Sequence, residues 1–207
     1  MIVVIDNQYL GSVYLHLILY HCGNIKIEQY EVFQKMSFRN RCIIAGAEGP
    51  ITLSIPLQNG REQKVPITEV RIANKYSWQQ QHWRAIKSCY GRSPWFEFYM
   101  HELEKFYNTP YELLFDWNND LRNWVLQKLG IDILSDFTTG FQRSYEQEKY
   151  LDLRNKILPK NYTGFPCPEY LQVFRERTGF LPNLSVLDLL FCKGKNAKRY
   201  LQNFSMI

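Results

Sequence analysis

The segment 34–42 places three strong hydrogen-bond donors directly before an apolar run. Arg39, Asn40 and Arg41 precede residues 42–45, whose sequence Cys-Ile-Ile-Ala predicts a buried strand. Guanidinium groups bind phosphate and carboxylate oxygens through paired N–H donors, and loops held by a rigid scaffold often carry such contacts. On an extended backbone, Arg39 and Arg41 point to the same side. We therefore expect an anion-binding loop here; the alternative is a pair of surface arginines whose stems cover aromatic neighbours.

His82 is a candidate for proton transfer, because the ordinary pKa of imidazole lets it accept and release a proton near neutral pH. It lies within an apolar stripe of helical spacing, so the alternative is a hydrogen-bonded histidine of the core. Asp6 follows a β-branched run at 2–5 and precedes a helical pattern. Open α/β sheets bind ligands at the carboxyl ends of their strands. Asp6 is therefore a second candidate, the alternative being a cap for the helix.

Polar residues also interrupt the apolar block 180–191. Ser185 and Asp188 could form a polar pair in an active site, with Asn183 just before them. The alternative is structural, since a serine at the N-cap followed by an acidic residue three positions later has the spacing of a capping box. Arg154 lies in a segment of little periodicity, and there it is either a ligand clamp or a solvated charge.

The N-terminal part of the chain, 1–75, has the pattern of a sheet with one crossover helix. Helical spacing over 9–20 separates the first two strand-like runs. The runs that predict strands are 2–5, 25–28, 42–45, 51–57 and 69–73. Turn residues between 45 and 51 indicate a hairpin. We therefore expect a mixed sheet of about five strands.

The second part, 77–207, is predicted to be mainly helical, because the apolar period changes to 3.6 residues at Ser77. Helices are expected over 77–90, from 93, from a capping box at 109–112 to Gly130, over 169–178, over 186–192 and over 195–204. Residues 135–168 show no such pattern and predict a long mobile segment, which is either a lid or a plain connection. The prediction is a single α/β domain over 1–207.

Composition restricts the class of protein. A hydrophobic content of 45% with 22% charged residues is typical of a globular chain. The net charge of +5 is mild; it favours an anionic ligand and does not indicate nucleic acid. Five widely spaced cysteines predict a reduced, cytoplasmic chain without a metal site. Polar residues from Asp6 onward interrupt the N-terminal apolar run, so neither a signal peptide nor a membrane span is expected.

The chain also lacks the common catalytic signatures. It has no phosphate-binding P-loop, no dinucleotide-binding glycine motif, no nucleophile elbow and no zinc-hydrolase motif. No cofactor is therefore indicated, and the reaction stays open on the residues alone.

Several segments together are similar to the WbqC-like protein family, over nearly the whole chain. They are Tyr9-Leu10, the core Lys-x-Ser-Phe-Arg-Asn-Arg-Cys of 35–42, Gly49-Pro50 with Ile55-Pro56, Trp78-x-x-x-His82-Trp83, and the block 180–191. The resemblance implies a bacterial protein of O-antigen or other surface-polysaccharide biosynthesis, acting on nucleotide-linked sugars. The family's usual Gln-Pro-x-Tyr-Leu-Pro-Trp turn is replaced here by Asp-Asn-Gln-Tyr-Leu-Gly-Ser at 6–12, so the roles of that Gln and Trp do not transfer.

The resulting hypothesis is a cytosolic enzyme that transfers an acyl or aminoacyl group to a nucleotide-linked amino sugar. In it, Arg39 and Arg41 hold the phosphates, Asn40 fixes the loop or a sugar hydroxyl, and His82 is the base, with Asp6 or Asp188 orienting it. Aromatic residues would stack on the sugar or base, namely Tyr9, Phe38 and Trp83. The further ligand-binding candidates are Asn183, Ser185 and Arg154.

Two other classes remain open. One is a sugar-nucleotide or glycan-binding partner without catalysis, which needs the arginines and aromatic residues but not His82. The other is a nucleotidyl or phosphoryl transferase, which requires Mg²⁺ and depends on Asp6. The sequence does not indicate an oligomeric state.

Overall fold

Four short parallel strands form the sheet of the computed structural model, which describes residues 1–204. Their spatial order is β5 (Leu134–Phe137), β2 (Asn24–Ile27), β1 (Ile2–Ile5) and β6 (Tyr150–Asp152). Val3 pairs with Ile25 on one side and with Leu151 on the other, so β1 lies inside the sheet. A strand covered on both faces needs a continuous apolar run, which explains the sequence Ile-Val-Val-Ile.

Helix α1 (Val13–Cys22) makes the predicted crossover from β1 to β2. It begins after Ser12, whose side-chain oxygen accepts a hydrogen bond from the backbone N–H of Leu15, and it ends at Gly23 with a φ of 71°. The helix was predicted from residue 9. The structure starts it later because the backbone turns at Leu10, which has a φ of 44°. This turn is what carries the chain away from the end of β1.

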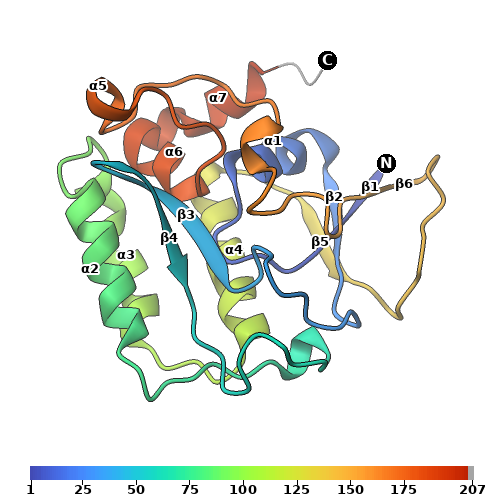
Figure 1. Ribbon diagram of the computed structural model, residues 1–207. Coiled ribbons are helices and arrows are strands. Elements are labelled where there is room, and N and C mark those ends of the chain that lie inside the picture. The colour runs from blue at the N-terminus through green and yellow to red at the C-terminus, as the bar shows by residue number, and fades with distance from the viewer. Residues whose placement is uncertain (205–207) are drawn as a thin grey trace.

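The antiparallel hairpin of β3 (Arg41–Gly46) and β4 (Gly49–Ser54) confirms the predicted hairpin, and it lies between the helices α2 and α3 and the parallel sheet in Figure 1. The strand predicted over 69–73 is wrong. That region holds a 3-10 helix, Ile67–Glu69, and isolated bridges at Arg71 and Ile72. Its alternating apolar side chains are buried in the core, but its backbone forms no β-ladder. The alternation therefore indicates burial of these side chains and not pairing with another strand.

Three amphipathic helices follow: α2 (Trp78–Tyr90), α3 (Phe96–Asn108) and α4 (Leu114–Leu129). The predicted capping box at 109–112 is wrong, because α4 begins only at Leu114. The Thr109 hydroxyl instead donates to the carbonyl of Lys105 at 2.8 Å and so closes α3. The predicted end of α4 is confirmed at Gly130, where φ is 61°.

The C-terminal part is less helical than predicted. Over 169–178 only α5 (Arg175–Thr178) is helical. Helix α6 (Val186–Lys193) agrees with the prediction, whereas α7 (Ala197–Gln202) covers only part of 195–204. Both α6 and α7 pack against α1, as Figure 1 shows. Residues 205–207 of the predicted domain lie outside the described residues.

The segment 135–168 contains β6 and nearly all of β5, which the sequence does not predict. Both strands are short, and every residue of β5 is exposed, with Leu134 76% exposed. An exposed edge strand carries no apolar pattern. The α/β class is confirmed, but the sheet takes two of its four strands from the second part of the chain. Closure of this segment over a ligand stays a prediction.

Gly194 offers a test of how the C-terminal helices pack. Its φ is 53°, and a β-carbon there would lie 2.0 Å from the ring of Trp95. Gly194→Ala should destabilise the protein by about 3 kcal/mol or more, through steric overlap and backbone strain. Gly140→Ala is the control, since nothing lies within 4 Å of its β-carbon, and it should change stability by less than about 1 kcal/mol. Urea denaturation measures both, and equal effects would contradict this packing.

Candidate functional site

Six charged side chains gather at the carboxyl ends of the parallel strands, and we call them the strand-end network. They are Asp6, Glu28, Glu31, Arg39, Asp152 and Arg154. All except Asp152 are buried. Ligands of open α/β sheets bind at this edge, and buried charges are retained only where they are paired. The network is therefore the first candidate for a functional site.

Arg39 is the centre of the network and is fully buried. Its Nε and Nη2 donate to the two carboxylate oxygens of Glu31 at 2.8 and 2.5 Å. Its Nη1 lies 3.3 Å from Asp6 Oδ2, and Nη2 also donates to Asn155 Oδ1 at 3.0 Å. One guanidinium group thus joins the residues that follow β1, β2 and β6.

Arg154 forms the second half of the network. It donates to both oxygens of Asp152 at 2.9 and 2.7 Å and to Glu28 Oε2 at 2.8 Å. The rings of Phe141 and Tyr145 lie over the guanidinium, 5.6 and 4.7 Å from its carbon. Arg154 therefore fastens the connection between β5 and β6 to the strand ends.

Acids outnumber bases in the network, with four carboxyl groups against two guanidinium groups. The pKa of Glu31 is raised to about 7, chiefly by burial; Asp6 and Glu28 add to the effect, while Arg39 opposes it. A carboxyl group with a pKa near neutral can both accept and return a proton under physiological conditions. Glu31 is therefore the best candidate for acid–base chemistry.

A cavity of about 500 Å³ opens in front of the network. Its walls are formed by Tyr30, Glu31, Val32, Gln34, Phe141, Arg143, Asp152, Arg154, Asn155 and Lys156. Tyr30 and Phe141 are 48% and 60% exposed at its rim. A cavity of this size with exposed aromatic rings and converging charges suits a polar ligand of the size of a sugar or larger.

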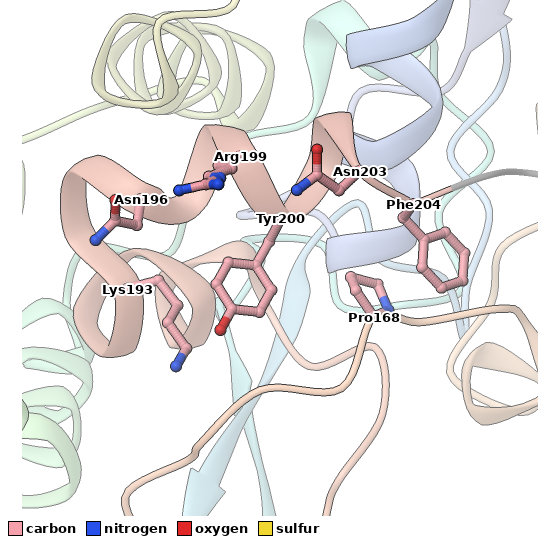
Figure 2. A pocket seen from close by; sticks show the side chains of 7 residues that line it. All are labelled: Pro168, Lys193, Asn196, Arg199, Tyr200, Asn203 and Phe204. Atoms are coloured by element: carbon pink, nitrogen blue, oxygen red, sulfur yellow. The ribbon is translucent and has the colours of Figure 1, made fainter.

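Two other cavities suit such a ligand less well. The first, beside Asp6, Gln8 and Arg122, has a volume of about 10 Å³, which is the room of one water molecule. The second, about 550 Å³, lies between Pro168 and α7, and Figure 2 shows its lining side chains. Its cations, Lys193 and Arg199, point in different directions in Figure 2, and its walls contain no carboxyl or imidazole group to move a proton.

Comparison with known proteins identifies the family. A model of the WbqC-like protein family matches residues 14–163, which is most of the chain and includes all of the strand-end network except Asp6. The chain belongs to the WbqC-like protein family. It is also 27% identical to the uncharacterized protein Rv1507c of Mycobacterium tuberculosis (strain ATCC 25618 / H37Rv), over 82% of this chain and 84% of that protein. No solved structure matches the chain.

In this WbqC-like protein, His82 lies away from the cavity, in an aromatic cluster. Its Nδ1 is 3.1 Å from the hydroxyl of Tyr9, which also contacts the hydroxyl of Tyr107 at 2.7 Å. The rings of Trp78 and Tyr9 pack against the imidazole. Burial lowers the pKa of His82 to about 4, so the ring is neutral at physiological pH. The roles of His82 as base and of Tyr9 as a stacking residue stay predictions.

The polar residues near α6 make structural contacts. Asp188 accepts hydrogen bonds from Tyr90, Tyr170 and Gln172 at 2.8–2.9 Å. Asn183 donates to the carbonyls of Tyr162 and Phe165, and Ser185 caps α6. These contacts hold 162–188 against α2. The proposed orienting role of Asp188 and the ligand-binding roles of Asn183 and Ser185 stay predictions.

The extended backbone expected at Arg39 and Arg41 is not present, because β3 begins only at Arg41 and the residues before it are in a turn. Strand alternation therefore does not relate the two side chains. That the two arginines hold one anion together stays a prediction. Arg41 is half-buried, and its Nη1 lies 3.8 Å from Met36 Sδ. Asn40 donates to the carbonyl of Ile55 at 2.9 Å and so fixes the turn, as one of its two expected roles requires.

The two remaining aromatic candidates pack into the protein. Phe38 is buried beside Tyr162, and the indole N–H of Trp83 donates to Glu104 at 2.8 Å. Of all the predicted site residues, the structure brings together Asp6, Arg39 and Arg154 in the network. Sequence reasoning missed Glu28, Glu31 and Asn155.

Among residues 1–204, no three His, Cys, Asp or Glu side chains are grouped to hold a metal ion. In the same part of the chain, no helix is both long and apolar enough to cross a bilayer.

Arg39→Gln should destabilise the protein by about 3–5 kcal/mol, because it leaves the buried carboxylates of Asp6 and Glu31 without their cation. Arg41→Gln is the matched control two residues away. It removes a half-buried guanidinium without an ion pair in residues 1–204, and it should cost less than about 1 kcal/mol. Chemical denaturation of the two variants at pH 7 measures the difference, and similar losses would argue against the buried ion pairs.

The raised pKa of Glu31 also predicts a pH dependence of stability. Between the unfolded pKa, about 4.3, and the folded value of about 7, the folded state binds the proton more tightly. The stabilisation of the folded state by this proton is complete below the unfolded pKa of Glu31, and it is lost as the pH rises to the folded pKa. Relative to Glu31→Gln, the wild type should lose on the order of 2–3 kcal/mol between pH 4.5 and 7.5. If the difference in stability between the wild type and Glu31→Gln does not change over this pH range, the pKa of Glu31 is not raised.

Proposed function

We propose that the cavity at the strand-end network is an active site for surface-polysaccharide biosynthesis in the bacterial cytosol. In this cavity the protein transfers a small acyl or aminoacyl group to the amine of a nucleotide-linked amino sugar. The observation that carries the proposal is Glu31: a buried carboxyl group with a pKa near 7 in the wall of a cavity of about 500 Å³. Membership of the WbqC-like family supports the choice of substrate class.

The chemistry requires a base, because an amine attacks a carbonyl carbon only as the free base. Glu31 would accept the proton of the amine as its nitrogen forms a bond to the acyl carbon. The bond to the leaving group of the donor then breaks, and Glu31 can return the proton to that group. The excess of carboxyl groups in the network favours an ammonium ion in the cavity before the reaction.

Arg39 acts in this proposal as a positioning residue. Both oxygens of Glu31 accept from its guanidinium at 2.5 and 2.8 Å, and Asp6 neutralises it from the other side. The guanidinium is thus paired with both acids, although its Nη1 makes no hydrogen bond within the described residues, and it fixes the carboxyl group of Glu31. The phosphate-binding role predicted for Arg39 would require these ion pairs to open.

The proposal is tested by incubating the protein with a panel of nucleotide-linked amino sugars and activated acyl and aminoacyl donors, with mass spectrometry of the products. Glu31→Gln should lower turnover at least about a hundredfold, while calorimetric binding of the nucleotide sugar changes little. The wild-type rate should rise with pH through about 7. Glu62→Gln, at an exposed ion pair with Lys35, is the control and should leave the rate unchanged.

Other outcomes would assign the other classes. Nucleotide-sugar binding without turnover from any donor indicates a binding partner without catalysis. Turnover that a chelator abolishes and that depends on Asp6 indicates a Mg²⁺-dependent transferase. Loss of turnover in folded His82→Gln, with full activity in Glu31→Gln, would return the base assignment to His82.

A further inference from the structure

Two exposed cations border the outer part of the cavity. Arg143 lies in the connection between β5 and β6, and Lys156 follows β6. Neither makes an ion pair within residues 1–204. They differ in this from Arg39 and Arg154, whose charges the network neutralises. Their charge is therefore available to a ligand.

The same two cations also border a second cavity. It has a volume of about 450 Å³ and shares Arg143, Asp152 and Lys156 with the cavity of about 500 Å³. The two cavities therefore meet at these residues. Arg154 occupies both oxygens of Asp152. At this junction the acid is therefore held by Arg154, while neither Arg143 nor Lys156 forms an ion pair within residues 1–204.

The position of Arg143 is fixed from both sides. Phe141 and Tyr145 pack on the guanidinium of Arg154, and Arg154 Nη1 donates to the carbonyl of Gln142 at 2.9 Å. The backbone around Arg143 is therefore tied to the strand ends. Lys156 follows directly after Asn155, whose side chain accepts from Arg39. Both cations thus stand on backbone that the buried network holds in place.

We propose that Arg143 and Lys156 form the diphosphate subsite of this protein. Two cations that form no ion pair in the described part of the chain match a ligand with two adjacent negative charges better than they match a single carboxylate. The inner part of the cavity carries the excess of carboxyl groups and repels the same anion, so the ligand lies with its diphosphate outward and its amine toward Glu31. This orientation rests on the proposed function; the anion subsite itself rests on the two cations.

Sodium pyrophosphate without added metal is the probe, and titration calorimetry at low ionic strength is the measurement. The wild type should bind pyrophosphate at least about tenfold more tightly than inorganic phosphate, and the double variant Arg143→Gln/Lys156→Gln should lose at least about tenfold of that affinity. The control Arg84→Gln/Lys87→Gln removes one Arg and one Lys that are exposed on α2 and also lack ion pairs in the described residues. It should stay within about twofold of the wild type.

The outcomes separate this inference from the proposed reaction. Equal losses of affinity in both double variants would show a general charge effect and overturn the subsite. A wild type that does not bind pyrophosphate would also overturn it, as would unchanged binding in Arg143→Gln/Lys156→Gln. Glu31→Gln should bind pyrophosphate at least as well as the wild type, since it removes a carboxyl group. Selective pyrophosphate binding without any sugar turnover leaves the subsite in place and removes the reaction. Turnover that depends on Glu31 but not on Arg143 and Lys156 supports the proposed reaction and overturns the diphosphate subsite.

Discussion

The structure depends on one buried cation held between two acids. Arg39 has no exposure to water and contacts Glu31, Asp6 and Asn155, which come from three different parts of the chain. Burying such charges is costly, and an ion pair that loses one partner leaves an uncompensated charge in the interior. The loops that follow β1, β2 and β6 are therefore confined to one arrangement, and a cavity built from them has fixed walls.

This constraint also organises the electrostatics of the site. The inner network has more carboxyl than guanidinium groups, whereas the outer junction of the two cavities carries Arg143 and Lys156, which form no ion pair among residues 1–204. A ligand with a cationic and an anionic end meets complementary charge at both. Arg154 couples the two parts, because its ion pairs belong to the network while its aromatic and backbone contacts hold the segment that carries Arg143.

The sequence predicts features that a local pattern encodes. The start of α6 at Ser185, the end of α4 at Gly130 and the extent of α2 follow from capping residues and the 3.6-residue period. Strands β5 and β6 are missed because short, partly exposed strands have no periodic signal. A local sequence pattern also cannot predict which side chains pair within the site, since Glu28 and Arg154 are 126 residues apart. Glu31 lies in the connection between β2 and β3, where no spacing of residues distinguishes it from its neighbours.

His82 and Glu31 illustrate how burial acts on opposite kinds of acid. Burial disfavours the charged form of each, so it lowers the pKa of the imidazole to about 4 and raises that of the carboxyl group to about 7. A base whose conjugate acid has a pKa near 4 is too weak to hold the proton of an amine at neutral pH. A carboxyl group with a pKa near 7 is close to half-protonated there, and it can take the proton and give it back. The same desolvation that weakens the imidazole as a base thus makes the glutamate carboxylate a stronger one.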